Sequence, residues 1–185
     1  LSTSAESLPT TICSRSQTIS FGPVPFDAIY DWLVAQGINR ALAKNVSHLC
    51  EGKPGLALEL VADKKALDAR LAPARVFCDA ASSTLAERWQ ASGKLLGSLK
   101  GAEAVERAAA ILNGWRLAMR DLLLMRLNHP ELSVHASLDQ ELQALLPRLS
   151  VSDLRRFDRK LEEARIHLAS NVSPKLVLEH VMMSL

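Results

Sequence analysis

The spacing of apolar residues predicts helices over most of the chain. The clearest pattern lies in residues 151–171, where apolar side chains recur every three or four positions and charged side chains fill the gaps. This amphipathic stripe consists of Leu154, Phe157, Leu161, Ala164 and Leu168. Such spacing puts the apolar side chains on one face of a helix, which then packs against a neighbour.

Residues 102–128 carry apolar side chains on several faces, because Ile111, Leu117 and Leu124 lie outside the main stripe. A helix that is apolar nearly all round is buried among its neighbours. We therefore predict that this segment is a buried helix of a bundle.

Three short helices are predicted within residues 23–63. The first ends at Gly37, because glycine readily adopts the left-handed conformation that ends helices. Asn39 is a good N-cap for the second helix, and Pro54 lies in the first turn of the third, where a missing N–H costs nothing. These helices form a small three-helix module.

A larger helical bundle is predicted for residues 64–185. Residues 64–96 form one long helix or a broken pair with a kink at Pro73, because an internal proline removes a helical hydrogen bond. Ser137 with Gln140 predicts a capping box at the start of the next short helix.

The last predicted helix starts near Pro174 and is apolar on more than one side. Whichever face it buries, we expect Val177, Val181 and Met182 or Met183 to leave apolar surface exposed. Exposed apolar surface of this kind marks a partner site. Val177, Val181 and Met182 are therefore our candidates for a subunit interface.

The first residues differ from the rest. Residues 17–21 alternate polar and apolar side chains, which predicts a short strand, and the sequence GPVP at residues 22–25 then interrupts regular structure. We interpret residues 1–22 as the end of a mixed α/β domain. Because the chain does not begin with methionine, we expect it to be part of a longer protein.

Composition adds few constraints. With 48% hydrophobic and 23% charged residues and a net charge of +2, the 185-residue chain is typical of a soluble globular protein without a strong charge signal for nucleic acid or membranes. Cys13, Cys50 and Cys78 form no CxxC pair, so neither a disulfide framework nor a zinc site is indicated, and a cytoplasmic location is the default.

The motifs of common enzymes and metal sites are absent from the sequence. The five histidines show no ligand spacing, and the chain has no GxSxG motif, glycine-rich phosphate loop or Walker A lysine. We therefore expect no metal, no cofactor and no catalytic activity in this chain by itself. Residues 39–52 could form the second helix of a DNA-binding helix-turn-helix, but Arg40 and Lys44 beside Asn45 make a thin basic surface.

Arg15 is the unusual charged residue. It lies between Ser14 and Ser16 on a polar turn, and the next charged residue along the chain is Asp27. From this spacing alone, Arg15 is either a solvated loop residue or an arginine whose partner lies elsewhere.

The segment LPTTICSRSQTISF resembles a motif of AAA+ clamp-loader subunits, in which leucine-proline is followed by isoleucine, one residue and serine-arginine. In that family the arginine reaches across a subunit boundary to the nucleotide held by its neighbour. The resemblance implies that Arg15 acts in trans and that Ser14 and Ser16 position it, although the family usually has cysteine where Ser16 stands. The segment LASNVSPKLVLEHVMMSL is similar to the closing signature of the same family.

The resemblance also implies a domain order. Residues 1–22 would be a remnant of the α/β AAA+ nucleotide-binding domain, residues 23–63 a three-helix lid, and residues 64–185 a helical collar for oligomerisation. The fold class is thus all-α apart from the remnant.

Gly55 separates two kinds of clamp-loader subunit. In subunits that hydrolyse ATP, a glycine-x-x-arginine sequence places a sensor arginine over the bound nucleotide, whereas here Gly52-Lys53-Pro54 is followed by Gly55. A subunit with the donated arginine but without the sensor arginine resembles the delta-prime type of the bacterial DNA polymerase III clamp loader. The alternatives are a gamma/tau-type motor subunit and a helical adaptor or DNA-binding module unrelated to AAA+ proteins.

The resemblance implies partners as well. They are the other subunits of a hetero-pentameric clamp loader and, through that complex, the sliding clamp and primed DNA in replication, with no membrane involved.

The absence of a phosphate loop generates a first prediction. The purified 185-residue chain should release no phosphate from ATP above a buffer blank, because it has no group that binds and orients the nucleotide phosphates. A colorimetric phosphate assay with and without DNA measures this, and reproducible turnover would contradict it.

Overall fold

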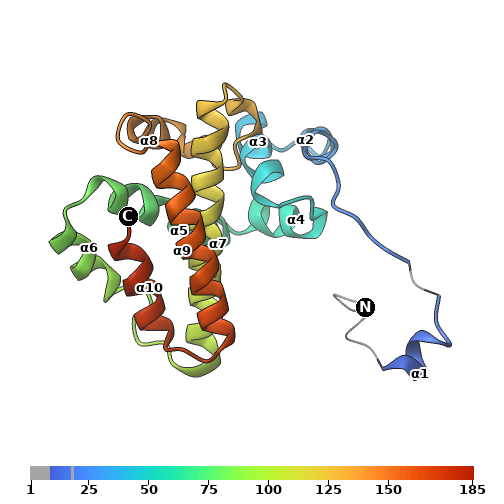
Figure 1. The fold of residues 1–185 in the computed structure, drawn as a ribbon. Coiled ribbons are helices and arrows are strands. Elements are labelled where there is room, and N and C mark those ends of the chain that lie inside the picture. The colour runs from blue at the N-terminus through green and yellow to red at the C-terminus, as the bar shows by residue number, and fades with distance from the viewer. Residues whose placement is uncertain (1–8, 18) are drawn as a thin grey trace.

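The computed structural model describes residues 9–17 and 19–185, and every regular element within them is a helix (Figure 1). The all-α class is therefore confirmed for this part of the chain. The elements are α1 (Thr10–Cys13), α2 (Phe26–Ala35), α3 (Arg40–Leu49), α4 (Pro54–Ala62), α5 (Lys64–Ser82), α6 (Leu85–Ser92), α7 (Gly101–Arg126), the 3-10 helices η2 (Pro130–Leu132) and η3 (Ala136–Leu138), α8 (Asp139–Leu145), α9 (Val151–Ala169) and α10 (Pro174–Met183).

The boundaries of α2, α3 and α4 follow the local signals in the sequence. Gly37 has a φ of 83°, in the left-handed region. The Asn39 side chain accepts a hydrogen bond of 2.9 Å from the Ala41 N–H, as an N-cap should. Pro54 is the first residue of α4. The prediction of three short helices within residues 23–63 is confirmed.

The interruption predicted at Pro73 falls elsewhere. Pro73 lies inside the continuous helix α5, and the break comes at Ser83 and Thr84, which both have extended backbone. Thr84 then starts α6 through a capping box with Glu87. A broken pair of helices is thus present, but its predicted position was wrong, because the break coincides with the capping box at Thr84 and not with Pro73.

The capping box predicted for Ser137 and Gln140 is also wrong. Ser137 lies within η3, and α8 begins at Asp139 without a side-chain cap. The preceding turn is already helical, so the Ser137 hydroxyl has no helix start to cap. A capping box does start α9, where Ser150 pairs with Asp153.

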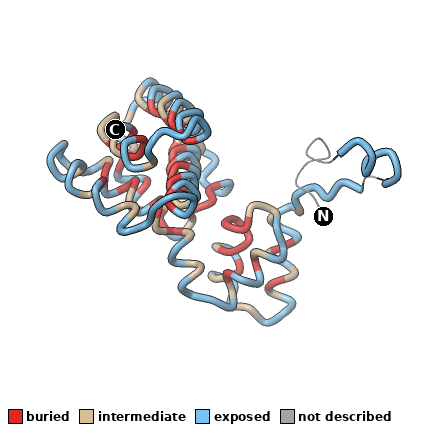
Figure 2. Tube along the Cα trace, turned by 90° about the horizontal axis from the view of Figure 1, so that it is seen from below, coloured by how far each residue is buried: buried red, intermediate tan, exposed pale blue. Residues whose placement is uncertain are grey.

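Buried side chains form two clusters (Figure 2). The larger cluster is formed by residues of α5, α7, η3, α8, α9 and α10, with the long helix α7 contributing the most. Phe77 and Trp115 are its largest fully buried residues. The smaller lies within α2–α4 and includes Leu71 of α5 and Val134 of the segment before η3.

The stripe on α9 is buried at all five positions, so that prediction is confirmed. The long helix α7 buries one broad side, but Val105, Arg116 and Arg120 on its other side are exposed, so the prediction that it is buried all round is wrong. No helix of the described chain is long and apolar enough to cross a lipid bilayer.

The strand predicted for residues 17–21 does not form in the described part of that segment. Ile19, Ser20 and Phe21 have irregular backbone and are exposed, and Thr18 lies outside the described residues. A strand needs a paired neighbour for its backbone hydrogen bonds. In Figure 1 this segment runs between α1 and α2, away from the helical body.

Gly114 lets α5 and α7 approach closely. A Cβ at position 114 would lie 2.4 Å from the Cβ of Pro73, whereas one at Gly55 meets nothing within 4 Å. The Pro73 ring of α5 therefore packs directly on α7 at Gly114, where α7 has no side chain.

Gly114→Ala should lower the free energy of unfolding by about 1–3 kcal/mol, because the added methyl group overpacks this contact. Gly55→Ala is the matched control and should be neutral or raise that free energy by about 0.4–1 kcal/mol. Urea denaturation followed by circular dichroism measures both. A Gly114→Ala variant as stable as the parent would contradict the tight contact.

Candidate functional site: an exposed arginine and a buried carboxylate

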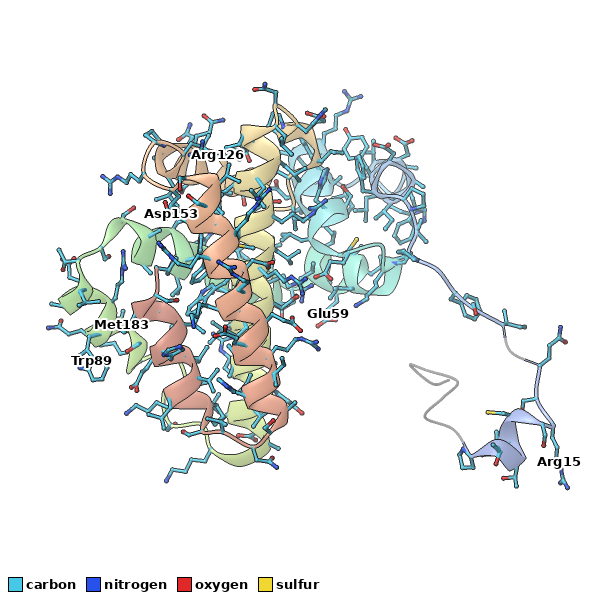
Figure 3. The ribbon with its side chains drawn as sticks, in the orientation of Figure 1. Arg15, Glu59, Trp89, Arg126, Asp153 and Met183 are labelled. Atoms are coloured by element: carbon cyan, nitrogen blue, oxygen red, sulfur yellow. The ribbon has the colours of Figure 1, made fainter. Side chains whose placement is uncertain are left out.

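The backbone turn that carries Arg15 is built from α1. The Ser14 N–H donates to the Thr10 carbonyl at 2.9 Å, and the Arg15 N–H donates to the Ile12 carbonyl at 3.1 Å. This turn leaves Arg15 exposed at the end of the N-terminal segment, and its side chain points away from the helical body (Figure 3).

The two serines beside Arg15 have different contacts. The Ser14 hydroxyl donates to the Thr11 carbonyl at 3.3 Å and so closes the turn before the arginine. The Ser16 N–H donates to the Cys13 carbonyl at 3.4 Å. Within residues 9–17 and 19–185 no carboxylate forms an ion pair with Arg15.

The first turn of α4 contains Gly55, the position at which ATP-hydrolysing clamp-loader subunits would have the sensor arginine. Gly52 has a φ of 76°, and a Cβ there would lie 2.5 Å from the Pro23 Cβ. Its carbonyl accepts a hydrogen bond of 2.9 Å from the Val24 N–H, which fixes the segment before α2 against the start of α4. Gly55 is exposed in the first turn of α4.

The residues considered for a DNA-reading helix lie in a mixed environment. Arg40 and Lys44 are exposed and line a hollow of about 590 Å³, which Asp27 and Glu131 also line. The carboxylates offset the two cations, so the basic surface on α3 is as thin as the sequence indicates. Asn45 is half-buried.

The interface predicted on the last helix is wrong in its premise. Val177, Val181 and Met182 are 3%, 0% and 1% exposed, because α10 packs against α6, α7 and α9 at once. These side chains belong to the core of this chain and offer no surface to a partner. The large apolar side chain that α10 does expose is Leu176.

A buried carboxylate at the junction of the two clusters was missed from the sequence. Asp121 in α7 is fully buried and accepts hydrogen bonds from the Val134 N–H at 3.0 Å and the His135 N–H at 2.9 Å. The Nδ1 of His135 lies 2.8 Å from the same carboxylate and, because a carboxylate can only accept, it carries the proton. The available signal was an aspartate inside the apolar run of residues 117–125.

These hydrogen bonds decide the charge state of Asp121. Burial, the largest influence, raises the pKa of this carboxyl, but the hydrogen bonds from the His135 ring and from two backbone N–H groups outweigh it and hold the pKa below its ordinary value of 3.8. Asp121 is therefore an anion at neutral pH, although water does not reach it.

Asp121 also fixes how the α2–α4 cluster meets the bundle. It holds Val134, whose side chain is buried in that cluster. Next to it, burial followed by the charge of Lys44 lowers the pKa of His48, while the backbone of Ser133 acts in the opposite direction. An ion pair between Glu51 and Arg70 joins the same two parts.

Within residues 9–17 and 19–185 there is no group of three or more histidine, cysteine, aspartate or glutamate side chains that could bind a metal ion.

Comparisons of the chain with protein-family models, with curated proteins and with solved structures find no match. Its function is therefore argued from its own residues.

Asp121→Asn should lower the free energy of unfolding by about 3–5 kcal/mol, because it leaves buried N–H donors without an anionic acceptor. Asp158→Asn, which removes an exposed ion pair of 3.8 Å with Arg116, is the control and should change that energy by about 1 kcal/mol or less. Urea denaturation measures both.

The effect of Asp121→Asn should also depend on pH. Because the folded-state pKa is lowered, the carboxylate contributes its full stabilisation above the ordinary value of 3.8 and loses it as the pH falls through the lowered pKa. The stability difference between parent and variant should thus stay constant from neutral pH down to about pH 5 and shrink below it. A difference that is the same at all pH values would show that the charge is irrelevant.

Proposed function

We propose that this chain is the C-terminal part of a clamp-loader subunit that supplies Arg15 to ATP bound by a neighbouring subunit. The observation that carries the proposal is an exposed guanidinium that forms no ion pair within residues 9–17 and 19–185, on a closed turn between two small serines. A planar and permanently charged guanidinium suits the charge that develops on a transferring γ-phosphoryl group. An arginine whose partner is another chain's phosphate needs no carboxylate of its own.

The order of the two buried clusters supports this proposal. A small α2–α4 cluster followed by a larger α5–α10 bundle fits a lid followed by a collar. The collar would join the other subunits of a hetero-pentamer, which loads the sliding clamp onto primed DNA in the cytoplasm.

Gly55 favours a subunit of the delta-prime type over a motor of the gamma/tau type. The position is exposed at the start of α4, and a Cβ there would meet open space. An arginine side chain would therefore fit at position 55. Steric crowding does not explain why glycine stands there, and we relate the glycine to the lack of a sensor arginine. On this proposal the subunit donates a catalytic arginine but has no sensor arginine for a nucleotide of its own.

Arg15→Ala in the full-length subunit, assembled with its partners, should slow DNA-dependent ATP hydrolysis at the neighbouring site by roughly 10³–10⁵. Arg15→Lys should fail as well, because a compact ammonium cannot reproduce the two-pronged guanidinium. Gln17→Ala, an exposed position on the same segment, is the control and should leave hydrolysis unchanged.

Phosphate release measures the rate, and size-exclusion chromatography checks that each complex still assembles. An Arg15→Ala complex that hydrolyses ATP at the parental rate would make Arg15 a solvated loop residue and remove the basis of the proposal.

A further inference from the structure

A groove between α7 and α9 combines an apolar floor with an arginine rim. Its volume is about 890 Å³. Arg116 and Arg120 of α7 and Arg155 and Arg159 of α9 line it, and all four are exposed. The apolar side chains that line it are Leu117, Met119, Leu123 and Leu154.

The cations of α9 differ in whether a carboxylate pairs with them. Three are held by carboxylates one turn away, and these are Arg156 with Asp153 at 2.8 Å, Lys160 with Glu163 at 2.7 Å and Arg165 with Glu162 at 2.8 Å. Arg155 and Arg159 border the groove and have no ion pair within the described residues. Like charges one turn apart on a helix repel each other, so this placement weakens the isolated fold.

The two arginines on α7 are only partly neutralised. Arg116 lies 3.8 Å from Asp158, an exposed pair that water screens. Arg120 lies 3.8 Å from Asp121, but that carboxylate already accepts hydrogen bonds from Val134 and His135. The rim therefore keeps an excess of positive charge that faces outward.

The groove continues along both helices. A second hollow of about 300 Å³ shares Asn113 and Arg116 with the first and extends to Val105 and Leu168. The ion pair between Arg165 and Glu162 also lines this second hollow, so its charge there is balanced. From Leu123 back to Val105 the two hollows follow α7 over 18 residue steps, which is roughly 27 Å at 1.5 Å per residue. That length matches a helix of about five turns.

We propose that this α7/α9 groove binds an acidic amphipathic helix of another protein. The apolar floor calls for an apolar helix face, and the arginine rim calls for carboxylates, which arginine binds through two parallel hydrogen bonds. Single-stranded nucleic acids instead stack their bases on aromatic rings, and no aromatic side chain lines either hollow. The inference goes beyond the proposed function and does not rest on Arg15.

The test uses the 185-residue chain and a fluorescent synthetic helix of about 18 residues, with leucines on one face and glutamates on both flanks. A scrambled peptide of the same composition and a single-stranded oligothymidine serve as competing probes. Arg155→Ala/Arg159→Ala removes the unpaired cations. The matched control, Arg156→Ala/Lys160→Ala, removes two cations from the same turns of α9 that each pair with a carboxylate.

Fluorescence anisotropy near physiological salt should give binding of the amphipathic peptide at least about tenfold tighter than that of the scrambled one. The groove variant should weaken it by about tenfold or more, and the control variant by about twofold or less. Circular dichroism confirms that both variants remain folded. Equal binding of the two peptides, equal loss in the two variants, or tighter groove-dependent binding of the oligothymidine would each overturn the proposal.

Discussion

The arrangement of this protein depends on one buried carboxylate. Asp121 sits at the core side of the longest helix, where an unpaired charge would be costly, and it is compensated by three N–H groups from the segment around Val134 and His135. That segment has no regular secondary structure to satisfy its backbone, so the carboxylate takes the role that a neighbouring strand or helix would have. The position of Val134, and with it the contact between the two buried clusters, follows from this network.

The arginines without an ion pair in the described residues include one on the N-terminal segment and two on α9. Arg15 lies on a segment that makes no tertiary ion pair within the described residues, and Arg155 and Arg159 lie on a helix whose other cations are matched. Asp158 and Glu162 lie one turn from Arg155 and Arg159 but pair with Arg116 and Arg165 instead. Our two proposals assign the guanidiniums that remain to the phosphate or the carboxylates of another molecule.

Features that depend only on residues close together in the sequence, such as helix starts and amphipathic stripes, could be predicted from the sequence. Asn39, Pro54 and the α9 stripe act within one helical turn or on one helix face, so their effects could be read directly. Arg15 was found in the same way, because its isolation is already visible between Ser14 and Asp27. What could not be read depends on contacts across the fold: the packing of Pro73 against α7 rests on Gly114, and the burial of Val181 rests on the neighbouring helices, α6 among them. Whether a helix face is exposed depends on which other helices pack against it, and the sequence of that helix alone does not show this.

The position of α10 has a consequence for how the chain folds during synthesis. This helix closes the space between α6, α7 and α9, yet it follows all three of them in the sequence and is therefore synthesised after them. Until Leu178 and Met182 arrive, the partners already made keep an open apolar face, because contacts between distant parts of a chain form only once both parts exist. The bundle is therefore completed only once α10 has been synthesised, and the interval before that is when a chaperone has most to bind.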